Sequence, residues 1–425
     1  MSKTNPIVVE GDQIKLRLQA ERTAHNTPIH VDWVRFTCLL RSVTPDFLTR
    51  RGPVLPTRDM LAKRSVASVG RMVVHKPRYN DELSESEQDR VHRLIRCTLE
   101  AYEAEHQTPA FQWASGQALE LAKEIVEALG EEFEVSPEIK GGKDFYKYSF
   151  IIERKGHPCG WVGFMAGSNS HSAQAQNQTI HANIEGHACT FAAAGWTDRI
   201  ADLIDKHEAK ITRADLALDL FDGGLDMDGL KDLYLSGGFD VRGRRPQTDV
   251  KGDWVNGRER SFYVGSRKNG KETNIYEKGD QLFGREANSP WVRIELRYGD
   301  QNRVLPSDIF RRPADFFAGA SDWHQLQLVK HEAPAIPQKI SVHKALPLQT
   351  VKAEISRNLR WAFTSAAPTI AAAFKYLSES EFLELCDWRK HKLPGRLRKF
   401  SESDLLGAFS VTNSGGGAGH TLLAA

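Results

Sequence analysis

Hydrophobic and polar residues alternate along several short segments of the chain, with the two-residue period of half-buried β-strands. This pattern predicts strands over residues 28–39, 146–152, 161–165, 179–190, 210–221, 260–266, 272–277 and 291–298. Apolar residues recur at helical spacing elsewhere, which predicts helices over 84–106, 117–129, 197–209 and 225–235, with Ser84 and Glu87 as a capping box for the first of these. After Pro334 and Pro337 the pattern is helical again, over 348–363, 370–377 and 379–388.

The order of these segments predicts an α+β fold, with a mostly antiparallel central sheet, flanking helices, a helical insertion near the N-terminus and a helical C-terminal part. We expect an N-terminal extension over 1–27 and a core over 28–335, with the insertion at about 80–132. A helical region over 336–412 and a flexible glycine-rich tail over 413–425 complete the expected organisation.

Composition narrows the class of protein. A chain of 425 residues that is 40% hydrophobic and 26% charged is typical of a globular protein with a substantial core. No apolar stretch is long enough to span a membrane, and residues 1–5 do not resemble a signal peptide, so we expect a cytoplasmic protein. Five scattered cysteines without CxxC spacing argue against a disulfide framework and a structural zinc site.

Positive charge is concentrated in two segments although the formal net charge is only +2. Residues 241–268 hold eight Lys or Arg against three acidic residues, and a second basic cluster covers 389–399. Such clusters suit contact with a phosphate backbone, and a solvated surface loop is an equally good interpretation of either cluster alone.

Three of the predicted strands each present one polar face, because successive side chains of a strand point to opposite sides. The three polar sets are Arg213, Asp215, Ala217 and Asp219; then Asn274, Tyr276 and Lys278; then Arg293, Glu295 and Arg297. If these strands are neighbours in one sheet, carboxylates, a tyrosine, a lysine and arginines converge on one surface. A merely solvated polar face is the plainer alternative, and the pattern alone does not decide between them.

That combination of side chains suits phosphoryl transfer. Carboxylate oxygens hold Mg²⁺ or Mn²⁺, and a tyrosine hydroxyl is a nucleophile once a metal or cations favour its phenolate. Lys278 could favour that phenolate or protonate a leaving oxygen. Asp215 and Asp219 are four residues apart, roughly 13 Å along a straight strand, so they cannot both bind one ion unless a bulge intervenes. We therefore favour Asp215 with Glu295 as metal ligands and place Asp219 either at the rim of the site or behind the ligands, where it would contact them and not the ion.

At these same residues the chain resembles the replication initiation factor family of rolling-circle plasmids and filamentous phages. The resemblance covers roughly residues 28–330 and is carried by an ordered set of motifs: Thr212-Arg213-x-Asp215-Leu216-Ala217-x-Asp219, Tyr263-x-Gly265, Asn274-Ile275-Tyr276-x-Lys278 and Arg293-Ile294-Glu295. Asp32-Trp33 is similar to the opening strand of the phage members, and Gly186-x-x-Cys189 to a later strand end.

The resemblance implies a metal-dependent enzyme that nicks one DNA strand at a replication origin. Tyr276 would form a 5′-phosphotyrosine and free a 3′-hydroxyl, and Asp215 and Glu295 would supply Mg²⁺ or Mn²⁺ ligands. To this set we add Lys278 and Arg293 as candidate catalytic residues and Asp219 as a further candidate metal ligand. The expected partners are double-stranded or extruded single-stranded origin DNA, a host helicase, a host polymerase and a second copy of the chain. The expected DNA contacts are Arg213, Arg242, Arg244, Arg245, Arg258, Arg260, Arg267, Lys268, Lys271 and Arg297.

This sequence departs from the plasmid pattern in two places. The gap between Asp219 and Tyr276 is longer and holds the basic stretch around 242–260, which suggests an added DNA-contacting loop. Gln281 replaces an acidic residue often found five positions after the tyrosine, which puts any role for that position in doubt.

Other classes of protein are less well supported. No His-x-His motif occurs, which disfavours the nicking enzymes that bind metal through it, and Tyr276 in a strand argues against a tyrosine recombinase. His181, Glu185, His187 and Cys189 would share one strand face, but they are spread too widely for one tetrahedral zinc ion. A DNA-binding replication or transcription regulator without cutting activity is the main alternative.

Overall fold

The computed structural model describes residues 6–25, 27–43, 103–167 and 175–342, together with parts of the stretches 93–101 and 354–405. The chain divides into two compact units, one made of residues 1–165 and 178–342 and the other of residues 166–177 and 343–425. The expected capping box at Ser84 and Glu87 and the tail over 413–425 lie outside the described residues. No helix of the described part is long and apolar enough to cross a membrane.

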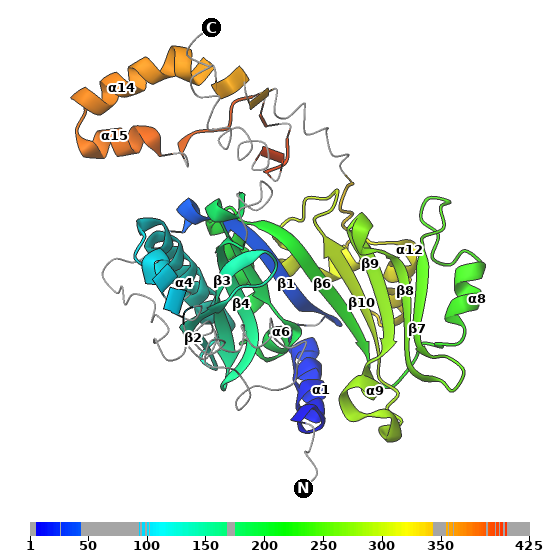
Figure 1. The fold of residues 1–425 in the computed structure, drawn as a ribbon. Helices are drawn as coiled ribbons and strands as arrows, with labels where there is room; N and C mark the ends of the chain where they lie inside the picture. The colour runs from blue at the N-terminus through cyan, green and yellow to red at the C-terminus, as the bar shows by residue number, and fades with distance from the viewer. Residues whose placement is uncertain are drawn as a thin grey trace. The chain divides into compact units, whose positions relative to one another are not determined.

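The first unit is built on one 10-stranded antiparallel sheet, which confirms the predicted α+β class (Figure 1). The strand order is β2-β3-β4-β5-β1-β6-β10-β9-β8-β7. The strands are β1 (Ile29–Leu39), β2 (Phe133–Gly141), β3 (Tyr146–Arg154), β4 (His157–Ala166), β5 (Thr179–Ile184), β6 (Lys210–Leu220), β7 (Thr248–Asp253), β8 (Arg258–Ser266), β9 (Lys271–Glu277) and β10 (Val292–Gly299). The three strands with polar faces, β6, β10 and β9, are therefore direct neighbours.

One face of this sheet is apolar and covered by helices. Alternate residues such as Leu216 of β6 and Ile294 of β10 are fully buried in one continuous core with side chains of α4, α7, α11 and α12. Helices that contribute buried residues to this core include α4 (Pro109–Leu129), α7 (Trp196–Lys206), α8 (Leu230–Leu235), α10 (Asp308–Arg311), α11 (Pro313–Ala318) and α12 (Asp322–Lys330). This burial fixes which face of each strand remains for polar side chains.

Three other helices pack near the opposite, polar face: α1 (Pro6–His25), α6 (Gly186–Phe191) and α9 (Lys278–Phe283). A small apolar cluster joins Leu18 of α1 to Leu282 of α9 and to Trp291, which precedes β10. Arg17 of α1 also donates a hydrogen bond of 2.7 Å to the carbonyl oxygen of Ala192, just after α6. The segment expected to be a simple N-terminal extension therefore contains a helix that packs on the core of this unit.

Several predicted boundaries were wrong for identifiable reasons. The strand expected over 179–190 ends at Ile184, because the chain turns at Glu185 into helix α6. The helix expected from residue 117 begins at Pro109, where the Thr108 side chain accepts a hydrogen bond from the backbone N–H of Phe111 and caps the helix. The sequence pattern also missed α1, β2 and β7.

Short 3₁₀ segments complete the first unit and its borders: η1 (Leu40–Ser42), η2 (Ala175–Gln178), η3 (Arg267–Asn269) and η4 (Arg285–Ala287). The second unit contains a π-helical turn, η5 (Ala362–Ala366), followed by α14 (Ala367–Tyr376) and α15 (Glu379–Cys386). Ser378 and Glu381 form a capping box at the start of α15. A small cluster of Ile355, Leu397, Phe400 and Leu405 is buried within this unit. Arg389, Arg396 and Lys399 of the second basic cluster lie outside the described residues.

Candidate functional site

The polar face of the sheet is organised in rows of side chains that lie opposite one another across neighbouring strands. The pairing registers give three adjacent rows across β6, β10, β9 and β8: Asp219, Arg293, Tyr276 and Ser261; Ala217, Glu295, Asn274 and Tyr263; Asp215, Arg297, Glu272 and Gly265. A cleft of about 800 Å³ lies over these rows and is also lined by Ile14 of α1, His187 of α6 and Lys278 of α9. The sheet thus brings Tyr276, Lys278, Arg293 and Glu295 together in one cleft, while Asp215 is buried on the same face.

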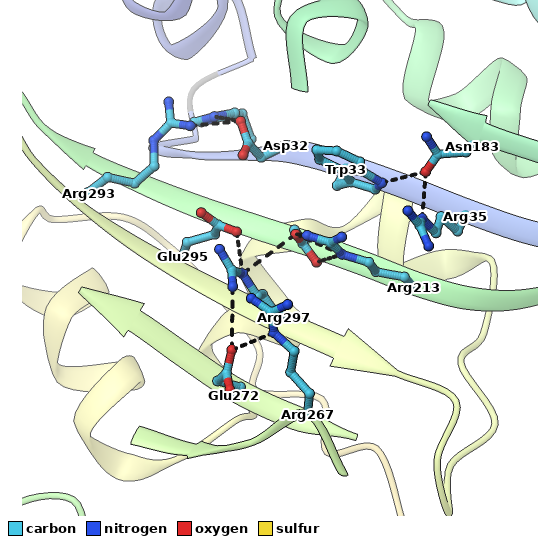
Figure 2. A network of polar contacts seen from close by, with 12 residues as sticks. Asp32, Trp33, Arg35, Asn183, Arg213, Arg267, Glu272, Arg293, Glu295 and Arg297 are labelled. Atoms are coloured by element: carbon cyan, nitrogen blue, oxygen red, sulfur yellow. Dashed lines mark hydrogen bonds and ion pairs between the residues drawn. The ribbon is translucent and has the colours of Figure 1, made fainter. Parts of the chain in front are cut away.

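Arg293 is held rigidly at the floor of this cleft. Its side chain is 2% exposed and donates to both oxygens of Asp219, from Nε at 2.8 Å and from Nη2 at 3.0 Å. Its Nη1 donates to Asp32 Oδ1 at 2.7 Å (Figure 2). Burial opposes ionisation of Asp32, yet Arg293 holds the pKa of that carboxyl below its ordinary value. Two carboxylates from different strands therefore fix one guanidinium opposite Tyr276.

Asp32 reaches Arg293 because β1 carries an irregularity at this residue. The register with β6 shifts between Val31, which pairs with Leu216, and Trp33, which pairs with Asp215. The extra residue in β1 is Asp32, as in a β-bulge, which re-aims side chains locally. Asp219 has further partners, since Trp291 Nε1 donates to it at 2.6 Å and His30 Nδ1 lies 3.4 Å away. The structure thus places Asp219, a candidate metal ligand, in the Arg293 network.

Asp215 and Glu295 lie in adjacent rows and are both paired with arginines. Arg213 hydrogen-bonds to both oxygens of Asp215. Arg297 Nε lies 2.5 Å from Glu295 Oε1 (Figure 2). The same Nε lies 3.9 Å from Asp215 Oδ2. Arg297 Nη1 also lies 3.4 Å from Glu272 Oε1. Burial raises the pKa of Asp215 to about 7; Arg213 opposes this shift and the nearby Glu295 adds to it.

Asn274 adds a third oxygen to this pair of carboxylates. It lies directly opposite Glu295 in the β9–β10 ladder, and its buried Oδ1 accepts no hydrogen bond from any residue that the structure describes. A buried carbonyl oxygen without a donor is costly, and a cation beside it would remove that cost. Within the described part of the chain no three His, Cys, Asp or Glu side chains form a metal cluster. The all-oxygen set of Asp215, Glu295 and Asn274 nevertheless fits the ligand preference of Mg²⁺ or Mn²⁺.

Tyr276 is half-buried, and its hydroxyl makes no hydrogen bond to any residue that the structure describes. Burial raises the pKa of its phenol well above the usual value, and the Arg293 guanidinium acts in the opposite direction. Lys278 follows β9 as the first residue of α9 rather than continuing the strand, and its Nζ lies 5.8 Å from the centre of the Tyr276 ring. Burial and, to a smaller extent, the nearby Arg293 guanidinium together lower the pKa of Lys278 to about 8.

A tryptophan with two arginines extends the cleft toward β5. Trp33 Nε1 donates to Asn183 Oδ1 at 2.7 Å, and Arg35 Nε donates to the same oxygen at 2.5 Å. The Arg213 guanidinium lies 4.4 Å from the Trp33 ring centre and that of Arg35 lies 5.8 Å away. Sequence reasoning noted Asp32-Trp33 only within the family resemblance and gave neither residue a role. Alternation within β1 could not reveal them, because the bulge breaks it.

The other expected DNA contacts are distributed over several surfaces. Arg242, Arg244, Arg245, Arg258, Arg267 and Lys268 are exposed. Arg260 lines the cleft and is held by Glu277 and Asp228, each at 2.7 Å. Lys271 lies on the face of β9 opposite to Tyr276, where its Nζ donates to the Ala320 carbonyl oxygen at 2.7 Å and burial lowers its pKa to about 8. Lys271 therefore has no position in the cleft.

Two sequence features have clear structural explanations. Gly265, in the motif Tyr263-x-Gly265, has φ +94°, and a Cβ there would lie 2.6 Å from the Lys271 carbonyl oxygen, so the turn into η3 requires glycine. The four residues considered for zinc do not share a strand face: His181 is in β5, Glu185 follows it, and His187 and Cys189 are in α6. The premise of that alternative was wrong.

The fold and the cleft define an α+β protein with tyrosine, arginine and carboxylate side chains gathered on the open face of an antiparallel sheet. The model of the replication initiation factor family matches residues 209–385, so the resemblance drawn from the motifs is confirmed for that part of the chain. No curated protein matches the chain. Among solved structures, a rolling circle replication initiator protein from Geobacillus stearothermophilus matches with 16% identity and a TM-score of 0.38, covering 73% of this chain and 98% of that one.

Proposed function

We propose that this protein initiates rolling-circle replication by nicking one DNA strand at an origin, with Tyr276 as the nucleophile. The observation that carries the proposal is the position of Tyr276: a phenol without a described hydrogen-bond partner, lying across the ladder from a buried arginine in a polar cleft. The match of residues 209–385 to the replication initiation factor family supports it.

In the proposed reaction the Tyr276 oxygen attacks a DNA phosphorus atom. A Tyr276–phosphate bond forms, the bond from phosphorus to the 3′-oxygen breaks, and the 5′ end of the DNA stays on the protein while a 3′-hydroxyl is released. Arg293 stabilises the phenolate, because it is fixed opposite Tyr276 and partly offsets the burial that raises the phenol pKa. Lys278 supplies a proton to the departing 3′-oxygen, since a lysine with a pKa of about 8 gives up a proton more readily than an ordinary lysine.

Asp215, Glu295 and Asn274 would hold Mg²⁺ or Mn²⁺ through oxygen. A bound divalent ion would neutralise charge on the phosphate and lower the barrier to its attack. Arg297, which lies beside both carboxylates, would then be free to bind a DNA phosphate. Trp33 and Arg213 offer a surface on which an unpaired base could stack.

The test uses supercoiled DNA that carries the protein's own origin, with Mg²⁺, with Mn²⁺ and with a chelator. Wild type is compared with Tyr276→Phe and with Tyr234→Phe, a control whose hydroxyl donates to the Pro246 carbonyl oxygen outside the cleft. We expect metal-dependent open circles and DNA attached through its 5′ end for wild type and Tyr234→Phe, and a severe loss for Tyr276→Phe. Undiminished nicking by Tyr276→Phe would refute the nucleophile assignment, and origin binding without any cutting would leave a DNA-binding regulator.

A further inference from the structure

The β7–β8 hairpin presents an exposed apolar side chain at its tip. Asp253, the last residue of β7, pairs with Arg258, the first residue of β8, and the four residues between them form the turn. Val255 in this turn is 93% exposed, the largest fraction among the exposed large hydrophobic side chains of the described residues. A single exposed valine is common on protein surfaces, so its meaning depends on how it is held and on what lies beside it.

The turn is held firmly on the sheet. The Asp253 carboxylate accepts hydrogen bonds from the backbone N–H of Asn256 at 3.0 Å and from its side-chain Nδ2 at 2.8 Å. Trp254 Nε1 donates to the Lys251 carbonyl oxygen at 2.9 Å, and the Trp254 ring packs against the apolar core of the first unit. Trp254 therefore anchors the turn, while the next residue, Val255, projects into solvent.

A strained bulge lies at the base of the turn. The register of β7 with β8 shifts between Lys251 and Asp253, so Glu259 and Arg260 of β8 together oppose Gly252. Gly252 has φ +92° and Glu259 has φ +49°, both in the left-handed region. A Cβ at Gly252 would overlap the Glu259 carbonyl oxygen, so this position requires glycine. A bulge re-aims the strand beyond it, and strain of this kind is tolerated where the resulting geometry serves a function.

The turn adjoins the end of the cleft that holds Tyr276. Ser261 of β8 pairs with Tyr276, and Arg258 lies three residues before Ser261, which is roughly 10 Å along a strand. Glu259 and Arg260, the two residues in between, line the cleft. Of the three rows of side chains across the sheet, the row with Tyr276 is therefore the one nearest to the turn.

Exposed cations flank the valine. Lys251 and Arg258 of the hairpin and Lys231 of α8 are exposed, and Lys231 Nζ lies 4.6 Å from the centre of the Trp254 ring. Lysine and arginine side chains bind the phosphates beside a base step, and an apolar side chain between them can enter that step and unstack it. The partner that fits both features is the junction at which double-stranded DNA opens into two single strands.

We propose that Val255 is a wedge that separates the strands of origin duplex beside the cutting site. This rests on the proposed nicking function, in which one strand reaches Tyr276 in the cleft. Val255 enters the base stack, Lys251 and Arg258 hold the flanking phosphates, and one strand continues into the cleft. At about 3.4 Å per nucleotide along a strand, a distance of roughly 10 Å places the cut about three nucleotides from the opened step.

Strand opening is measured apart from cutting, with Tyr276→Phe protein and supercoiled DNA that carries the protein's own origin. Permanganate, which oxidises unpaired thymines, reports the opened bases. Val255→Ser and Val255→Leu are compared in this background with Val329→Ser, a control at an exposed valine of α12, which covers the opposite face of the sheet. We expect Val255→Ser to reduce the reactivity beside the cutting site by more than about fivefold at saturating protein, while Val255→Leu and Val329→Ser retain it.

The same substitutions in the chain that retains Tyr276 give the second readout. We expect Val255→Ser to slow nicking of supercoiled origin DNA by more than about fivefold and to leave nicking of a single-stranded origin oligonucleotide within about twofold of wild type.

Equal permanganate reactivity of Val255→Ser and Val329→Ser, or no reactivity that depends on protein, would overturn the wedge and leave the nicking function intact. Equal losses of nicking on the two DNA substrates would also overturn it, because the residue would then act on the cutting step. Opening that depends on Val255, without cutting of any DNA by wild type, would support the wedge and refute the nicking function alone.

Discussion

Arg293 and Asp219 face each other across the β6–β10 ladder and are joined by two hydrogen bonds, both buried. Asp32 binds the remaining side of the same guanidinium from a strand two positions away in the sheet. Planar guanidinium and carboxylate groups match in this geometry, which an ammonium group cannot reproduce. The arrangement fixes a positive charge beside Tyr276 by contacts from two other strands, β1 and β6.

Replacing Arg293 therefore tests both stability and chemistry. Arg293→Met leaves two carboxylates without their cation, and we expect a loss of roughly 3–5 kcal/mol in the free energy of unfolding. Arg293→Lys retains the charge but not the bidentate contact, so nicking should slow by about a hundredfold or more while origin affinity changes little. Urea unfolding and single-turnover nicking measure the two effects. Equal losses of nicking and DNA affinity would contradict a role specific to the reaction.

The lowered pKa of Lys278 predicts that the nicking rate falls at high pH. Its folded pKa of about 8 lies below the ordinary value of 10.5, so its ammonium loses the proton as the pH rises through about 8. If it donates to the 3′-oxygen, the single-turnover rate at constant metal should fall above that pH. Lys278→Arg should remove this descending limb and Lys278→Met should lower the rate at all pH values. A profile unchanged by both substitutions would exclude proton donation by Lys278.

The raised pKa of Asp215 predicts that protons and a metal ion compete for its carboxylate. Its pKa is raised from 3.8 to about 7, so its contribution to stability is fully present below 3.8 and is lost as the pH rises through about 7 in the absence of metal. Only the ionised form binds a cation well, so the increase in Tm caused by Mn²⁺ should grow from pH 6 to pH 8. Thermal unfolding of Tyr276→Phe measures this without turnover. Asp215→Asn, the matched control, should show a small shift independent of pH.

The position of the Trp33 ring in the cleft predicts that it contributes to the affinity for unpaired DNA. Base stacking on an aromatic side chain contributes roughly 1–3 kcal/mol, so Trp33→Ala should weaken binding of single-stranded origin DNA by about fivefold to a hundredfold. Trp33→Phe, which keeps a ring but loses the bond to Asn183, should have a smaller effect. Fluorescence anisotropy at fixed salt measures both. Equal affinities of wild type and Trp33→Ala would place the unpaired bases elsewhere.

Alternation along β6, β9 and β10 predicted which of their residues share the polar face but not the pairings between those residues. Arg213, Asp215 and Asp219 share a face of β6 because every second residue does, and this follows from local sequence. The contact between Asp32 and Arg293 joins residues 261 positions apart and depends on the bulge in β1. The position of the buried Asn274 Oδ1 beside Glu295 depends on the register of β9 with β10. Such contacts depend on how distant segments pair in the folded protein, so they cannot be predicted from the sequence of any one segment.

Helix α1 was missed for a related reason. Its apolar residues do not form a regular stripe, and its position is determined by Leu18 in the cluster with Leu282 and Trp291 and by the Arg17 contact with Ala192. Helices whose stability comes from tertiary contacts are poorly indicated by periodicity. Ile14 of this helix lines the cleft, so the chain's first element forms part of the wall over the candidate site.

The outermost strand β7 pairs with β8 alone, and the exposed residues Arg242, Arg244 and Arg245 precede it in the chain. Charge changes at these exposed arginines therefore alter an outer edge of the sheet and leave the partners of β10 unchanged. Under the proposed function, exposed side chains at this edge that contact origin DNA can diverge between related replicons. The residues proposed to cut DNA lie at the centre of the sheet, so a change of origin preference would not require a change in the cutting site.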